Sequence, residues 1–161
     1  MNDIDSDVKV FGDKKRNVQM LIYNKIFDEC LTVASLGISK YLEGQFEVIM
    51  SVDSDFESAY TVLANAIFYM IQNQKNIYDG CLINGIENID KSFFERHGKS
   101  AVYFTYPFCF PEGFYKNGEF TFLLAFFISE EEVNFIKQNG VEAFEEYLEA
   151  SNIDVFEIDR D

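Results

Sequence analysis

The sequence predicts an α+β fold: a mixed, largely antiparallel sheet with one long helix and two short C-terminal helices packed against it. Three observations predict it. Short apolar segments typical of strands lie both before and after one long amphipathic segment that begins at Phe56. The aromatic run from Phe120 to Ile128 is typical of a strand buried on both faces, at the centre of a sheet. Two short amphipathic segments follow that run, so strands and helices do not alternate regularly.

The chain length and composition predict one domain that spans residues 1–161. A chain of 161 residues with 48% hydrophobic and 17% aromatic content buries a core and excludes disorder. With 18 Phe and no Trp, that core is expected to be packed by phenylalanine. Residues 1–7 are expected to fray. No signal-peptide core begins the chain, and no apolar run reaches membrane length, which favours a cytoplasmic protein.

The first segments alternate between apolar runs and turn signals. Residues 8–11 fit a strand or a short helix, and the basic stretch 12–17 fits a solvated turn. Residues 18–27 fit a strand or a bulged hairpin because polar residues interrupt the run. A strand at 30–36, closed by Gly37, follows.

The next strand is predicted at 46–52 from its strict alternation. Phe46, Val48, Met50 and Val52 share one face, and Glu47 and Ser51 lie on the other. The preceding turn at Glu43-Gly44 predicts that this strand is antiparallel to the one before it.

The long helix is predicted from Phe56 to about Asn73 or Gln74. Ser54 and Glu57 have the spacing of a capping box, and Asp55 alone is also a suitable cap. The apolar residues that follow recur at helical spacing and leave only a thin polar face. These apolar residues include aromatic ones, and a helix packed in the core explains them better than a cofactor site does.

The segments between this helix and the central strand are predicted from turn signals and short apolar runs. They are a turn at 78–80, a strand at 81–83, an exposed polar loop at 86–100, a strand at 102–106, a turn at 111–113 and a hairpin turn at 117–118.

The C-terminal unit has the clearest local signals. Ser129 and Glu132 have capping-box spacing directly after the apolar run. Gly140 ends this helix and starts a second one. Apolar residues of the second helix are expected to point inward and its glutamates outward.

Motifs for catalysis, cofactors or metals are absent from the sequence. There is no phosphate-binding glycine loop, no nucleophile elbow and no zinc-protease motif. The single histidine, His97, is expected to be a solvated loop residue, and the three widely spaced cysteines are expected to be reduced. The acidic run at 130–132 fits helix capping better than a cation site. We therefore expect no enzyme activity, no cofactor and no metal.

Negative charge is concentrated near the C-terminus. Asp and Glu number 28 against 13 Lys and Arg, which gives a net charge of −15. Residues 129–161 alone carry a net −9. Such a field repels nucleic acid and anionic membranes and attracts basic proteins. An ordinary solvated acidic surface is the alternative explanation.

The order of motifs resembles the suppressor-of-fused domain family. The matching features are Leu36-Gly37-Ile38-Ser39, a strand, a long helix, the Tyr78-Asp79-Gly80 turn, Phe127-Ile128-Ser129-Glu130-Glu131-Glu132, Gly140, Ile153-Asp154-Val155-Phe156 and Asp159-Arg160. They cover the chain from about residue 8 to its end. The resemblance implies a domain that binds and inhibits other proteins without catalysing a reaction.

Short acidic bacterial members of that family resemble immunity proteins, which neutralise a toxin, often a nuclease, encoded beside them. The resemblance thus implies a basic toxin domain as the partner. The alternative is a regulatory adaptor that binds an extended peptide or a transcription regulator. The residues predicted to bind the partner, unless they are only a solvated face, are Glu142, Glu145, Glu146, Glu149, Asp154, Glu157 and Asp159.

Overall fold

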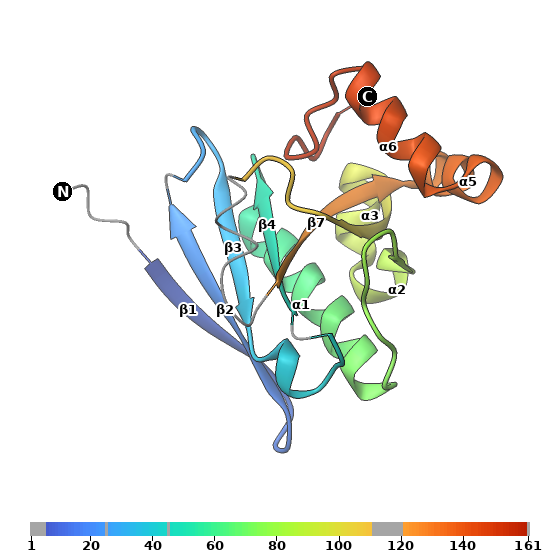
Figure 1. Cartoon of the computed structure of the whole chain (residues 1–161). Helices are drawn as coiled ribbons and strands as arrows, with labels where there is room; N and C mark the ends of the chain where they lie inside the picture. The colour runs from blue at the N-terminus through green and yellow to red at the C-terminus, as the bar shows by residue number, and fades with distance from the viewer. Residues whose placement is uncertain (1–5, 25, 45, 111–120, 161) are drawn as a thin grey trace.

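The fold is built on one large sheet, shown in Figure 1. The computed structural model describes residues 6–24, 26–44, 46–110 and 121–160. Within these residues, seven strands lie in the order β1-β2-β3-β4-β7-β6-β5. The strands are β1 (Ser6–Gly12), β2 (Asn17–Asn24), β3 (Leu31–Leu36), β4 (Phe46–Val52), β5 (Leu82–Asn84), β6 (Lys99–Thr105) and β7 (Thr121–Ser129).

The sheet is mixed and largely antiparallel, as predicted. All neighbouring strands are antiparallel except β4 and β7, which run parallel, with Phe46 opposite Thr121. The antiparallel β3–β4 pair confirms the prediction from the Glu43-Gly44 turn. Residues 8–11 form a strand, and Asp7 pairs with Ile22. The prediction that residues 1–7 fray is therefore wrong at its C-terminal end.

The helices lie on both faces of this sheet. They are α1 (Phe56–Gln72), α2 (Ile86–Ile89), α3 (Lys91–His97), α5 (Glu130–Asn139) and α6 (Val141–Ala150), with a 3-10 turn η1 (Ile38–Lys40) before β4. Helices α1, α2 and α3 contribute to one hydrophobic core, and α5 and α6 contribute to the other. Figure 1 shows α5 and α6 together at one end of the sheet. The long helix and the two C-terminal helices are confirmed.

Strand β7 joins the two cores because both of its faces are buried. Alternate side chains of a strand point to opposite faces, so consecutive residues enter different layers. Leu123, Ala125 and Phe127 enter the core with α1, and Leu124, Phe126 and Ile128 enter the core with α6. This confirms the prediction of a doubly buried central strand.

The Gly37-Ile38-Ser39 motif binds the buried carboxylate of Glu47. The Glu47 side chain accepts hydrogen bonds from the Gly37 amide at 2.8 Å and from the Ser35 hydroxyl at 2.6 Å. The Ile38 amide, the Ser39 amide and the Ser39 hydroxyl donate longer bonds of 3.2–3.4 Å. Gly37 has a φ of 119°, which is costly for other residues, so the motif builds a compact cradle of donors. Its role is structural.

Two predictions about the middle of the chain are wrong. Residues 86–100 form α2, α3 and the start of β6 instead of an exposed loop. The apolar side chains of Ile86 and Phe93 are fully buried and hold the two short helices against the core. Helix α1 has no capping box at Ser54: Asp55 occupies the N-cap position and makes no side-chain cap bond. Its carboxylate instead binds Arg96 and His97.

The turns predicted at 111–113 and 117–118 lie outside the described residues.

Candidate functional site

Helix α6 carries four of the seven acidic residues predicted to bind a partner. Phe144 and Leu148 are buried in the core beneath it, which turns the glutamates to the surface. Glu142, Glu146 and Glu149 are exposed and accept no hydrogen bond from the described residues. These three carboxylates are available to an external partner.

Glu145 differs because it fastens α6 to the sheet. Its carboxylate accepts hydrogen bonds from the Tyr103 hydroxyl at 2.7 Å and from the Thr105 hydroxyl at 2.8 Å. Burial and these carboxylate contacts raise the pKa of Tyr103. Tyr103 and Thr105 are buried on β6, so Glu145 supplies the acceptor that both hydroxyls need.

The three predicted acids of the C-terminal segment have different surroundings. Asp154 caps a turn by accepting from the Phe156 amide at 2.9 Å. Asp159 lies 2.6 Å from the His97 ring nitrogen Nδ1. Glu157 is exposed, and its backbone carbonyl accepts from Arg160. Only Glu157 of these three has a side chain without an internal partner among the described residues.

An aromatic hollow of about 530 Å³ lies beside α6. Glu145, Leu148 and Glu149 form its helical wall, and Tyr106 and Phe108 line the other side. Tyr106 is 53% exposed and Phe108 is 63% exposed. Sequence reasoning missed this hollow, although Tyr106 and Phe108 flank Pro107 immediately after a strand, where a chain leaves the sheet.

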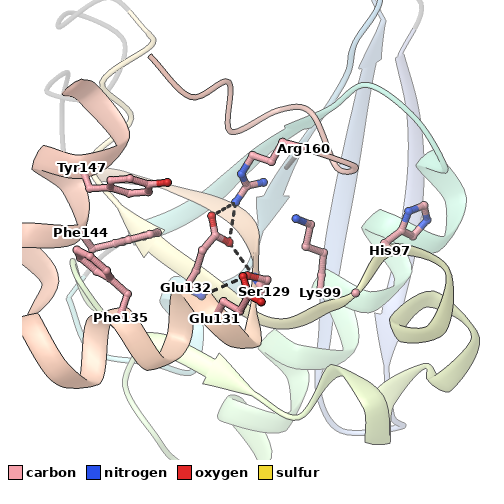
Figure 2. A pocket seen from close by; sticks show the side chains of 10 residues that line it. His97, Lys99, Ser129, Glu131, Glu132, Phe135, Phe144, Tyr147 and Arg160 are labelled. Atoms are coloured by element: carbon pink, nitrogen blue, oxygen red, sulfur yellow. Dashed lines mark hydrogen bonds and ion pairs between the residues drawn. The ribbon is translucent and has the colours of Figure 1, made fainter. Parts of the chain in front are cut away.

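A second, polar pocket of about 450 Å³ lies on the other side of the same helix (Figure 2). Tyr147 and Phe144 of α6 line it with Phe135 of α5. Its other lining residues come from the α3–β6 connection, the start of α5 and the C-terminal segment: His97, Gly98, Lys99, Ser129, Glu131, Glu132 and Arg160.

An ion pair between Glu132 and Arg160 lies within this polar pocket. The Arg160 nitrogen Nη2 is 3.1 Å from each carboxylate oxygen of Glu132 and donates to the Phe127 carbonyl at 2.8 Å. Glu132 also accepts from the Ser129 amide, completing the predicted capping box. Arg160 therefore anchors the C-terminal segment to the first turn of α5.

His97 is not a solvated loop residue, contrary to the prediction. Its side chain is only 9% exposed, and its Nε2 lies 2.7 Å from the Asp55 carboxylate. With Asp159 on Nδ1, the ring joins the start of α1 to the C-terminal segment. Burial favours a raised pKa for Asp55, but hydrogen bonds from His97, Arg96 and Ser58 outweigh it and lower the pKa below its ordinary value.

Lys99 is a buried cation that sequence reasoning missed. The residue is 4% exposed, and its amine makes no hydrogen bond or ion pair with any described residue. Burial and the nearby Arg160 guanidinium lower the pKa of Lys99. No local signal marks it, because the apolar part of this strand begins only at Ala101.

The described residues offer little for catalysis. No group of three His, Cys, Asp or Glu side chains among them is arranged to hold a metal ion. Burial raises the pKa of the Cys109 thiol to about 11 and also raises that of Cys81, which makes both weak nucleophiles. None of the described helices is both long and apolar enough to cross a membrane.

Comparisons with solved structures identify the fold. A suppressor of fused homolog from Neisseria gonorrhoeae FA 1090 superimposes with a TM-score of 0.78 at 18% identity, covering 97% of this chain and 87% of the homolog. Drosophila Suppressor of Fused gives 0.59 at 12% identity, and this chain covers only 42% of its length. A chain in a crystal structure of the Sufu-Fu complex gives 0.57 at 14% identity, covering 90% of this chain and 75% of that one.

Sequence comparison agrees. No curated protein matches the chain. The family model of the suppressor of fused protein, however, matches residues 14–161, which is nearly the whole sequence. The order of motifs from the Gly37 turn to Arg160, the mixed sheet and this match lead to one conclusion: the chain belongs to the suppressor of fused protein family.

Proposed function

We propose that this chain is a non-catalytic protein-binding domain, and specifically an immunity protein that binds and neutralises a basic toxin domain. The observation that carries the proposal is the surface of α6. It places the free carboxylates of Glu142, Glu146 and Glu149 beside an aromatic hollow.

Electrostatics support a basic partner. The whole chain has a net charge of −15, and free carboxylates on one helix concentrate that field locally. A field of this kind accelerates encounter with a positively charged surface and discourages acidic partners. A nuclease groove, which must bind a polyanion, is such a surface.

The hollow supports a stable complex. Exposed tyrosine and phenylalanine side chains are typical anchors of protein interfaces, and a ring of polar residues around them excludes water. Tyr106 and Phe108 are exposed at one wall, while Glu149 contributes to the opposite wall. The carboxylates then raise the association rate and select basic partners, and the aromatic anchors lower the dissociation rate.

The test uses the protein encoded next to this gene. That neighbour and this chain are produced separately, and their dissociation constant and association rate are measured at increasing salt. We expect a stoichiometric complex that abolishes the neighbour's toxic activity, with an association rate that falls as salt rises. A neighbour that does not bind, or that remains active when bound, contradicts the immunity role.

A regulatory adaptor is the second candidate, favoured by the outer strand of the sheet. β1 pairs only with β2 among the described strands, and its Val8 and Val10 side chains are 48% and 62% exposed. An open edge of this kind accepts an extended peptide as an added strand. The similar structure of the Sufu-Fu complex makes a regulatory partner chemically reasonable.

The two candidates differ in their dependence on salt. Binding through backbone pairing at β1 does not depend on ionic strength. Binding to the acidic surface of α6 weakens as ionic strength rises. A partner that binds equally well in high salt, and that is lost on replacing Val10 by Pro, favours the adaptor.

A further inference from the structure

The polar pocket contains an unpaired lysine, Lys99, beside the buried Arg160 guanidinium. The Lys99 amine has no hydrogen-bond acceptor or carboxylate partner among the described residues. The Arg160 side chain is 5% exposed, and its Nε atom is fully buried without an acceptor in the described part of the chain. The Arg160 Nε atom is enclosed by the protein, so a ligand cannot reach it. The Lys99 amine is not fully enclosed, so it is the donor that an external acceptor can satisfy.

The charges inside the pocket favour a ligand with a single negative charge. Glu132 is already bonded by Arg160 and the Ser129 amide, so Glu132 and Asp159 attract the Lys99 amine from a distance but neither forms an ion pair with it. Glu131 at the pocket lining and Asp159 nearby would repel a second negative charge on the ligand. A monocarboxylate therefore fits better than a phosphate monoester.

The remaining lining favours an apolar body on that ligand. Figure 2 shows Phe135, Phe144 and Tyr147 on one side of the Glu132–Arg160 pair, and Lys99 and His97 on the other. The Phe135 and Tyr147 rings are 5.5 Å apart, centroid to centroid, and Tyr147 is 45% exposed. A volume of about 450 Å³ lies within the usual range for small-ligand sites.

We propose that this pocket binds an organic monocarboxylate, with the carboxylate at Lys99 and an apolar or aromatic body against Phe135 and Tyr147. The proposal is independent of the toxin-binding surface. Two sources supply this chemistry: a free small acid, and the C-terminal residue of a polypeptide that ends in an aromatic side chain.

The experiment titrates the full chain with 3-phenylpropionate and follows backbone amide shifts by NMR. Three comparison probes are used: 3-phenylpropionamide, which lacks the charge; phenyl phosphate, which has a second charge; and a hexapeptide ending in phenylalanine, with a free or an amidated terminus. We expect shifts at 97–99, 129–135 and 160 with the carboxylate and at least tenfold weaker binding of the amide and the phosphate.

A matched pair of variants separates binding at the pocket from non-specific effects. Lys99→Met removes the proposed anchor and should abolish the shifts, while Lys40→Met replaces an exposed lysine and should leave them unchanged. The spectrum without ligand shows whether Lys99→Met is folded. If it is not, Tyr147→Ala, at an exposed position, should weaken binding at least fivefold.

The outcomes decide the proposal. Tighter binding of the free hexapeptide than of the small acid assigns the pocket to a polypeptide terminus, and the reverse assigns it to a free acid; both support the site. Equal binding of acid and amide overturns it. So does unchanged binding by a folded Lys99→Met variant, or an absence of shifts at millimolar ligand.

Discussion

Several sequence motifs of this chain exist because one side chain in each makes many internal contacts. Glu47 shows this most clearly, because its buried carboxylate holds together the end of β3 and the turn η1. No Lys or Arg pairs with it among the described residues, so its oxygens are satisfied by hydrogen bonds alone. A sequence can suggest the Gly37 turn, but it does not say which carboxylate the turn encloses.

Replacing Glu47 by Gln should destabilise the fold strongly. The amide keeps the shape but exchanges one acceptor for a donor, which leaves buried N–H or O–H groups of the cradle unpaired. We expect a loss of about 3 kcal/mol in the free energy of unfolding, measured by urea denaturation. Glu43→Gln, at an exposed position nearby, is the control and should cost less than about 0.5 kcal/mol. Equal effects of the two substitutions would refute this account of the motif.

Asp55 should make stability depend on pH in the acid range. Because hydrogen bonds lower its pKa in the folded state, its contribution is complete above the unfolded pKa of about 3.9 and is lost as pH falls below that value. Asp55→Asn keeps a residue that tolerates the observed φ of 47°.

We expect Asp55→Asn to cost roughly 1.5–3 kcal/mol at neutral pH, because it removes charge-assisted bonds to His97 and Arg96. The difference from the wild type should shrink toward about pH 3. Urea denaturation at both pH values measures it, with the exposed Asp28→Asn as control. A cost that does not change with pH would show that Asp55 acts through its shape alone.

The surroundings of His97 explain why residue-level reasoning failed there. Its two partners lie 42 and 62 positions away in the chain, at Asp55 and Asp159. Local polarity correctly indicated a polar setting for His97, but burial of the ring depends on contacts that no local pattern contains.

Elements with strong local signals were predicted well, and short ones were not. The β7–α5–α6 unit has a doubly apolar strand, a capping box and a glycine stop, and all three are present. Helices α2 and α3 span 4 and 7 residues, too short for helical periodicity to stand out. They exist because Ile86 and Phe93 are buried, which is a tertiary effect.

At the scale of elements, we expect Glu145 to stabilise the packing of α6 against β6. Glu145→Ala leaves the buried hydroxyls of Tyr103 and Thr105 without their acceptor and should cost about 1–3 kcal/mol in the free energy of unfolding. Glu146→Ala, one residue further on the exposed face, should change stability by less than about 0.5 kcal/mol.

A double-mutant cycle with Tyr103→Phe then isolates the contact. If Glu145 bonds to Tyr103 as described, the cost of Glu145→Ala should be smaller when Tyr103 is already Phe. Strict additivity of the two substitutions would mean that the contact contributes nothing. Loss of partner binding in Glu145 variants should therefore be interpreted as displacement of α6.

At the scale of the whole molecule, the fold class can be predicted from the sequence, but the order of the strands in the sheet cannot. The fold class followed from the order of strand-like and helix-like segments. The parallel contact between β4 and β7 did not, since it joins strands separated by α1, β5, α2, α3 and β6. That contact brings α6 and the C-terminal segment onto the same half of the sheet, where the acidic helix separates the aromatic hollow from the polar pocket.

Binding by α6 is the central claim, and a comparison of two charge-reversed variants with the wild type tests it most directly. Glu146→Lys/Glu149→Lys changes the proposed surface, and Glu43→Lys/Glu87→Lys makes the same change in net charge at exposed sites elsewhere. Both are titrated against the protein encoded next to this gene, which the proposal takes to be the toxin. We expect the first variant to bind at least a hundredfold more weakly, and the second to lose only a few-fold, mainly in association rate. Equal losses for the two variants would contradict a binding role for α6 and leave only a general effect of net charge.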